Sequence, residues 1–265
     1  MLRVPICQNN NMAVNGRKVS GKENPMPRFF IPPGEARPGC MLTLDRDASS
    51  HIARSLRMRA GETLTLSDGE GTDFEAEITG TGEAVTVRVL SESLCGTEPE
   101  TRAILFQALP KGDKMDWIVQ KATELGVYAI QPFLSSRCIS RPDGKSMEKK
   151  RARLQKIAFE AAQQSGRGRV PEVRGLVDIK DLPGIMPEKT LFFYEKGGKR
   201  VAELLSPGER EVGLIVGSEG GFSPEEAAFL ESQGAVPATL GARILRCETA
   251  PVCGLSVIFN CTGDI

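Results

Sequence analysis

Histidine and aromatic residues are scarce in this sequence. His51 is the only histidine among 265 residues, and Phe, Trp and Tyr together make up 5% of the chain, with Trp117 as the single tryptophan. A metal site built from several histidines is therefore excluded within one chain, and we expect no bound metal.

Paired cysteines and long apolar runs are also missing. The seven cysteines are an odd number and include no C-x-x-C pair, which does not suit a framework of disulfides. We therefore expect a reduced, cytoplasmic protein whose cysteines act as small buried hydrophobes. No stretch approaches the roughly 20 consecutive apolar residues that a membrane-spanning helix needs, so we expect no membrane partner.

Positive and negative charges balance overall but are distributed unevenly. Lys and Arg total 34, as do Asp and Glu, so the formal net charge is zero. Residues 137–174 contain eleven Lys or Arg and four Asp or Glu, whereas residues 61–100 contain one Arg and ten acidic residues. This asymmetry is typical either of a cationic face for a polyanion beside an acidic region, or of solvated helix surfaces.

Two regions of different pattern follow a polar N-terminal stretch. Residues 1–25 are polar, and we expect them to form a disordered extension. Residues 26–98 contain short alternating segments separated by Gly and Asp-Gly turns, which predicts a small β-rich barrel or sandwich. We expect one helix around 50–58 within it. The strands predicted by the alternation cover 63–66, 74–78 and 85–90.

From residue 102 the pattern changes to strands that alternate with helices. The apolar run AILFQAL at 103–109 suits a strand buried on both faces. The stretch KMDWIVQKATELG then places its apolar residues on one helical face, with Asp113 as the predicted N-cap and Gly126 as the end. Further strands are predicted at 127–133, 190–195 and 213–217, and a long helix at 146–165. The alternation predicts an α/β domain over 102–265 with a mostly parallel sheet.

The segment LIVGSEGGFSPEE, residues 214–226, is the strongest local motif. A buried strand leads through Gly217, Gly220 and Gly221 into a helix that begins with a predicted capping box of Ser223 and Glu226. Glycines at such a place let backbone amides approach a ligand closely. The motif is neither G-x-G-x-x-G nor G-x-x-x-x-G-K-[ST], so the Rossmann and P-loop interpretations lack their key residues.

A second candidate loop, ATLGARILRCETAP, lies near the end of the sequence at residues 238–251. Ile244 and Leu245 suit an apolar wall for a flat heterocycle. Arg243 and Arg246 suit the binding of a phosphate or of a developing oxyanion.

Each loop also has an alternative interpretation. The glycine segment is consistent with a tight strand–helix turn without a ligand. Glu219 inside it would repel a phosphate, so a ligand with a cationic or neutral end fits better. The two arginines of the second loop are consistent with simple ion pairs to Glu219 and Glu248.

Basic and polar residues also follow a strand end and a helix end. Lys111 and Lys114 come just after a predicted strand, where open α/β sheets bind ligands. Gln164, Arg167 and Arg169 lie at the end of the long predicted helix and suit contact with a nucleic-acid backbone. A solvated helix end is the alternative. We expect the single histidine to be structural or RNA-facing rather than catalytic.

Taken together and in order, these motifs resemble the family of ribosomal RNA small subunit methyltransferase E, which methylates N3 of a uridine in bacterial 16S rRNA. The matching segments, within residues 26–263, are PRFF, HIARSLRMRAGE, QALPKGDKMDWIVQKATELGV, PFLSSR, KIAFEAAQQSGRGRVPEV, VGSEGGFSPEE and LGARILRCETA. The resemblance implies a PUA-like RNA-binding β-barrel over 26–98 and a SPOUT methyltransferase domain over 102–265. That domain is expected to have helices on both faces, a deep trefoil knot, S-adenosylmethionine bound in the knot, and a homodimeric state.

The chemistry of uridine methylation suggests roles for individual residues. Because N3 must lose its proton, Arg246 is expected to stabilise the uridine anion, with Arg243 as the alternative or as a phosphate anchor, and Glu219 or Glu248 is a candidate base. The residues expected to bind the cofactor are Tyr194, Glu195, Val216, Gly217, Glu219, Gly220, Gly221, Leu240, Gly241, Ile244 and Leu245. The residues expected to bind 16S rRNA of the 30S subunit are Arg28, His51, Arg54, Arg57, Lys111, Lys114, Gln164, Arg167 and Arg169.

Three positions depart from the family pattern. Ser218 stands where the glycine loop usually has proline, and we expect it to loosen the loop without removing its amides. Pro251 and Gly254 are expected to weaken the last helix, which the resemblance places at the dimer interface. A non-catalytic RNA-binding or ribosome-assembly protein is therefore the main rival, and an α/β enzyme for another nucleotide is the second.

Overall fold

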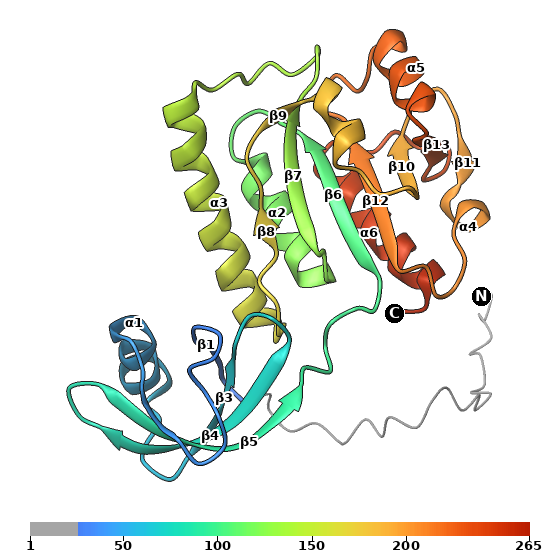
Figure 1. Cartoon of the computed structure of the whole chain (residues 1–265). Coiled ribbons are helices and arrows are strands. Elements are labelled where there is room, and N and C mark those ends of the chain that lie inside the picture. The colour runs from blue at the N-terminus through green and yellow to red at the C-terminus, as the bar shows by residue number, and fades with distance from the viewer. Residues whose placement is uncertain (1–25) are drawn as a thin grey trace, which may run out of the picture.

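The structure is a computed structural model that describes residues 26–265, so the extension predicted for 1–25 lies outside the described residues. Two sheets form the framework, one in each predicted domain. Figure 1 shows the N-terminal sheet below the C-terminal one, with the lower end of the long helix α3 (Gly144–Ser165) reaching toward it.

The N-terminal domain is a mixed sheet of five strands in the order β1-β3-β4-β5-β2. Its strands are β1 (Arg28–Phe30), β2 (Met41–Thr43), β3 (Thr63–Ser67), β4 (Thr72–Thr81) and β5 (Val85–Leu94). β1 pairs with β3 in parallel, and the other neighbours are antiparallel. The three strands predicted from alternation are present. The predicted barrel is an open sheet in its hydrogen bonding, because β1 and β2 are its two edges.

The helix predicted around 50–58 begins earlier and changes geometry along its length. α1 covers Arg46–Ser50, because the Asp45 side chain caps it by accepting a hydrogen bond from the Ala48 N–H at 2.7 Å. The chain continues as the π-helical segment η1 (His51–Leu56) and ends at Arg57, which has a left-handed φ of 55°.

The C-terminal domain is an α/β unit around a parallel sheet in the order β11-β13-β10-β12-β6-β7-β8, with β9 also paired to β7. The strands are β6 (Arg102–Ala108), β7 (Ala129–Leu134), β8 (Glu172–Val173), β9 (Val177–Asp178), β10 (Thr190–Phe193), β11 (Lys199–Arg200), β12 (Glu211–Val216) and β13 (Val236–Thr239). The helices besides α3 are α2 (Lys114–Leu125), η2 (Ile179–Gly184), α4 (Val201–Leu204), α5 (Pro224–Ser232) and α6 (Thr249–Thr262).

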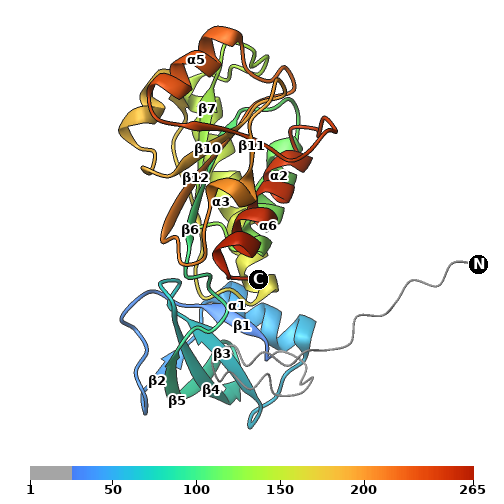
Figure 2. The same ribbon diagram turned by 90° about the vertical axis from the view of Figure 1, so that its right-hand side faces the viewer.

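Helices cover both faces of this sheet, as the resemblance implied (Figures 1 and 2). Successive residues of β6 point to opposite faces, as in any strand. Ala103 and Leu105 join a core cluster with α2, α3 and α6, whereas Ile104 and Phe106 join a second cluster with η2 and α5. Burial on both sides explains the continuous apolar run of the strand. The trefoil knot stays a prediction.

Two of the predicted helix ends are confirmed, and a third differs from the prediction. Ser223 and Glu226 form the predicted capping box at the start of α5. Gly126 ends α2 in the left-handed conformation, as expected. The prediction for Asp113 is wrong in its mechanism, because its side chain makes no capping hydrogen bond and lies 3.6 Å from Arg153 instead.

A buried ion pair ties the segment between the two sheets to the C-terminal domain. The Glu98 carboxylate accepts from Arg167 Nη2 at 2.6 Å and from the backbone N–H groups of Gly168 and Arg169. Arg167 Nη1 donates to the carbonyl oxygens of Thr123 and Val127. The Arg167 side chain is only 3% exposed and that of Glu98 17%. The hydrogen bonds within this clamp therefore replace those that the buried polar atoms would otherwise make with water.

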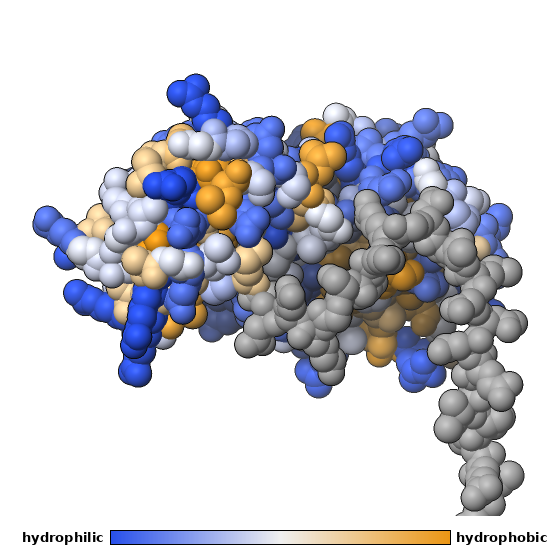
Figure 3. Space-filling model, turned by 90° about the horizontal axis from the view of Figure 1, so that it is seen from below, coloured by the Kyte–Doolittle hydropathy of each residue, from blue (hydrophilic) through white to orange (hydrophobic). Residues whose placement is uncertain are grey.

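Figure 3 shows the molecule from below. Where the described residues are visible, hydrophobic ones form separate patches between hydrophilic ones. Single exposed side chains such as Leu94 on β5 are ordinary for a folded domain. Among the helices of residues 26–265, none is both long and apolar enough to cross a membrane.

Removal of the clamp carboxylate should destabilise the fold strongly. The Glu98→Ala variant leaves a buried guanidinium and two backbone N–H groups without partners, and such losses cost about 3–5 kcal/mol. Glu100→Ala is the matched control, since its pair with Arg210 at 3.5 Å is about four-fifths exposed on both sides, and it should change stability by less than about 0.5 kcal/mol. Urea unfolding measures the free energy of unfolding of both variants. Equal losses of stability would show that the buried pair stabilises the fold no more than the exposed one does.

Candidate active site

Three loops meet at the carboxyl ends of neighbouring strands. β10 lies between β12 and β13, and all three are parallel, so the loops that follow them emerge at the same edge of the sheet. They enclose a cavity of about 520 Å³. Every residue predicted to bind the cofactor lines it: Tyr194, Glu195, Val216, Gly217, Glu219, Gly220, Gly221, Leu240, Gly241, Ile244 and Leu245. The loops around the cavity are therefore the ones in which the cofactor-binding residues were predicted.

The glycine loop is held by contacts that leave little room for side chains. A Cβ on Gly217 would lie 3.1 Å from the Gly221 Cα, and Gly221 itself has a left-handed φ of 62°. Arg137 supports the loop from outside, since its Nη1 donates to the Gly220 carbonyl at 2.6 Å. Ser218, where we expected loosening, is buried at 5% exposure, and its Oγ lies 3.4 Å from the Arg137 carbonyl oxygen.

A charged cluster around Lys114 lies beside this loop. The Lys114 Nζ lies 2.9 Å from Glu219 Oε1 and 3.4 Å from Glu248 Oε2. The Lys111 backbone N–H also donates to Glu219 Oε1 at 3.1 Å. The Lys114 ammonium therefore binds two carboxylates at the cavity wall, and its contact with RNA stays a prediction.

The protonation states within the cluster follow from its contacts. Burial alone would raise the pKa of Glu219, but the hydrogen bonds from Lys114 and from backbone N–H groups outweigh it and lower that pKa below its ordinary value. The pKa of Glu248 is lowered in the same way, by the Cys247 thiol, backbone and Lys114. The hydrogen bond to Glu219 raises the pKa of Lys114. Both carboxylates and the ammonium are charged at neutral pH.

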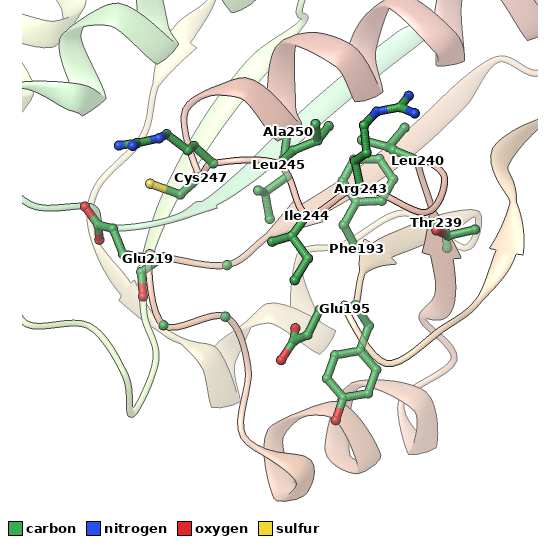
Figure 4. A pocket seen from close by; sticks show the side chains of 18 of the residues that line it. Phe193, Glu195, Glu219, Thr239, Leu240, Arg243, Ile244, Leu245, Cys247 and Ala250 are labelled. Carbon is green, nitrogen blue, oxygen red and sulfur yellow. The ribbon is translucent and has the colours of Figure 1, made fainter.

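The two arginines of the last loop are exposed and carry no ion pair within the described part of the chain. The alternative that they pair with Glu219 and Glu248 is wrong, since Lys114 binds both. Figure 4 shows Arg243 and Glu219 on opposite sides of Ile244. Ile244 is 86% exposed and lines the cavity. This is expected of an apolar side chain that a bound ligand covers.

Two residues predicted to bind RNA have structural roles instead. Arg167 belongs to the buried clamp with Glu98. Arg28 forms a bidentate pair with Asp73, and its side chain is 11% exposed. Sequence could not separate these arginines from surface ones, because their partners are distant in the chain.

The other predicted RNA contacts lie at or near the surface. His51 is exposed and packs its ring edge-on against Phe29 at 5.8 Å. Arg169 is half-buried, donates to the Glu70 carbonyl and lies over the Tyr128 ring. The remaining residues are exposed: Arg54, Arg57, Lys111 and Gln164. Their RNA contacts stay predictions.

Sequence reasoning missed several residues of the cavity. Phe193, Thr239, Cys247 and Ala250 line it. Phe193 lies in the strand predicted at 190–195 and the other three in the loop at 238–251, but none of them was assigned to the site. Gly254 was expected to weaken α6, but a Cβ there would lie 2.4 Å from Phe193 Cε2. The glycine therefore permits close packing of α6. Pro251 lies in the first turn of α6, the position where proline is tolerated.

The Cys247 thiol should resist alkylation in the folded protein. Burial, the hydrogen bond to Glu248 and the negative charge of Glu219 raise the pKa of Cys247 to about 12. At pH 8 only about one thiol in ten thousand is then ionised, and the thiolate is the nucleophile. Iodoacetamide labelling followed by mass spectrometry should find Cys247 modified only after unfolding, with half-buried Cys95 as the internal reference. Equal labelling of Cys247 in both states would contradict this protonation state.

Two family models match the chain, one in each domain. The model described as an RNA methyltransferase domain matches residues 97–259. The model described as an RNA methyltransferase PUA domain matches residues 44–90. The two matches correspond to the parallel α/β sheet and to the five-stranded sheet.

Sequence relatives and solved structures agree with these matches. Ribosomal RNA small subunit methyltransferase E of Bacillus subtilis is 34% identical over 219 residues, which cover 78% of this chain and 85% of the relative. The protein of that name from Mycobacterium bovis is 31% identical over 228 residues, 83% of this chain and 86% of the relative.

Two solved structures resemble the whole described fold. The methyltransferase E of Neisseria gonorrhoeae bound to S-adenosyl methionine has a TM-score of 0.81 at 32% identity, covering 89% of this chain and 97% of that one. A Legionella pneumophila methyltransferase with bound cofactor SAM has a TM-score of 0.79 at 35% identity, with the same coverage. This chain therefore belongs to the ribosomal RNA small subunit methyltransferase E family.

Proposed function

We propose that this protein transfers a methyl group from S-adenosylmethionine to N3 of a uridine in 16S rRNA of the small ribosomal subunit. The observation that carries the proposal is the cavity. The three loops that the resemblance assigned to the cofactor converge there, and two solved structures similar to this chain contain that cofactor.

The cavity has the features that S-adenosylmethionine requires. Its volume of about 520 Å³ falls within the range of small-molecule sites. Glycines expose backbone groups on one side, and Ile244 and Phe193 present apolar surface for a flat adenine. Glu195 and Glu219 line it as well, and their negative charge suits a sulfonium cation. When bound, the cofactor supplies an electrophilic methyl group.

Arg246 is the residue best suited to stabilise the uridine. Uridine N3 is a weak acid, and the anion formed on loss of its proton spreads charge onto O2 and O4. A guanidinium beside these oxygens favours that anion. Arg246 lines the cavity, and no carboxylate neutralises it in the described structure. Arg243 shares these properties and serves either in the same role or as an anchor for an RNA phosphate.

Glu219 and Glu248 are the candidates to accept the N3 proton. Both stay ionised at neutral pH because their pKa values are lowered, so each has the lone pair that a base needs. The Cys247 thiol beside them stays protonated, since its pKa is raised to about 12. Much of the remaining rate acceleration comes from holding N3 in line with the methyl group.

The cellular context follows from the same assignment. The protein acts in the cytoplasm on the 30S subunit, as a homodimer with α6 at the interface. The exposed residues His51, Arg54, Arg57 and Lys111 contact the rRNA. In support, the chain matches a PUA domain model over residues 44–90. The target uridine leaves its stack to reach the cavity.

Methyl transfer to isolated subunits tests the reaction and the substrate together. Purified protein, methyl-labelled S-adenosylmethionine and 30S subunits that lack the modification should give label in 3-methyluridine. A known methyltransferase E acting on the same subunits shows that they are competent. No label on competent subunits would favour an RNA-binding or assembly protein, and label in another nucleoside would contradict the substrate.

Arg246→Ala should lower turnover by about 100- to 1000-fold, the size of effect seen when one group that stabilises a developing oxyanion is removed. Binding of S-adenosylmethionine, measured by calorimetry, should stay within about twofold, because the guanidinium acts on the uridine. Arg210→Ala is the control, since Arg210 is exposed at the opposite edge of the sheet. Unchanged turnover in Arg246→Ala would remove this residue from the mechanism.

A further inference from the structure

The Glu219–Lys114–Glu248 cluster brings three charged side chains together at the wall of the cavity. Its ammonium lies between carboxylates that come from two different loops, at 2.9 and 3.4 Å. The Cys247 Sγ donates to Glu248 Oε2 at 3.1 Å and lies 3.8 Å from the Lys114 Nζ. These contacts join α2, the glycine loop and the start of α6 into one network.

The cluster carries a net charge of minus one. Two carboxylates and one ammonium are ionised, and the thiol is neutral at physiological pH. The side chains of the three ionised residues are 22–32% exposed, so water screens them only in part. Lys114, Glu219 and Cys247 line the cavity directly. The surplus negative charge therefore acts on whatever occupies it.

We infer that this cluster recognises the positive charge of the sulfonium, so that the cavity distinguishes S-adenosylmethionine from S-adenosylhomocysteine. This inference rests on the proposed function. Methyl transfer turns the sulfonium into a neutral thioether and leaves the adenosine, the amino group and the carboxylate of the ligand unchanged. A site with a surplus negative charge beside the sulfur prefers the donor, and this preference speeds release of the spent product.

Lys114 is the positioning residue of the cluster. Two carboxylates close together repel each other, and one of them would take up a proton or move into solvent without a cation between them. Lys114 keeps both ionised and in place while it limits the surplus to one charge. This explains why a lysine is placed where a cationic ligand is to be bound.

The ratio of two dissociation constants isolates the effect of the sulfonium. Calorimetry gives the Kd of S-adenosylhomocysteine divided by that of S-adenosylmethionine, and contacts common to both ligands cancel in the ratio. Glu219→Gln and Glu248→Gln each keep the shape of the side chain and remove one charge. Each should lower the ratio by about three- to tenfold, as expected for one partly screened charge near the sulfur.

The lysine variants test the positioning role of Lys114. Lys114→Met should leave the ratio at or below the wild-type value, because one carboxylate then takes up a proton or moves into solvent and the surplus negative charge does not grow. Lys114→Arg should leave the ratio within about twofold. Glu92→Gln, on the exposed surface of β5, is the matched control for loss of a carboxylate. Thermal unfolding shows which variants are folded, and the two Glu→Gln variants at separate loops provide independent tests.

Three results would overturn the inference. An unchanged ratio in both Glu→Gln variants would do so, even if both ligands bound more weakly, because the cluster would then contact the amino group that they share. A fall in the ratio confined to Glu195→Gln would place the sulfonium at the other carboxylate of the cavity. A rise in the ratio in the Glu→Gln variants would reverse the predicted sign. A wild-type protein that binds neither ligand would contradict the proposed function itself.

Discussion

The close packing of α6 on the sheet is the constraint on which the site depends. At Gly254 a single added carbon would lie 2.4 Å from Phe193 Cε2 and 2.9 Å from Leu214 Cδ2. Phe193 lines the cavity, and so do Cys247 and Ala250, at or just before the start of α6. The helix therefore carries the last loop over the cavity and fixes its distance from the glycine loop. A residue that sequence analysis regarded as a weakness of the helix allows the two loops to meet.

Charge is arranged differently inside and outside this cavity. Inside, carboxylates outnumber the single lysine, which suits a cationic donor. At the rim, Arg243 and Arg246 are exposed and unpaired within residues 26–265, which suits a polyanion and a developing uridine anion. Lys114 binds both Glu219 and Glu248, and neither carboxylate pairs with an arginine of the last loop in residues 26–265. Below, the Glu98–Arg167 clamp fixes the segment that follows β5 against the C-terminal domain.

Sequence patterns predicted the features that depend on neighbouring residues, such as strands and helix caps. They did not predict the features that depend on contacts between residues far apart in the chain. The apolar run at 103–109 and the capping box of Ser223 could be read from the sequence, because each follows from short-range chemistry. The convergence of the glycine and last loops was implied by the resemblance to the family. The burial of Arg167 and the role of Lys114 could not, since their partners are far away in the sequence and a basic residue looks the same whether it is paired or exposed. The start of the first helix was missed because the Asp45 cap was not recognised.

A crystal structure of the protein with S-adenosylmethionine bound tests the central claim most directly. The account predicts the cofactor in the cavity between the glycine loop and residues 240–245, with its adenine against Ile244 and its sulfonium facing the Glu219–Lys114–Glu248 cluster. A cofactor bound at any other place, or in this cavity with the sulfonium turned away from the cluster toward the arginine rim, would contradict it.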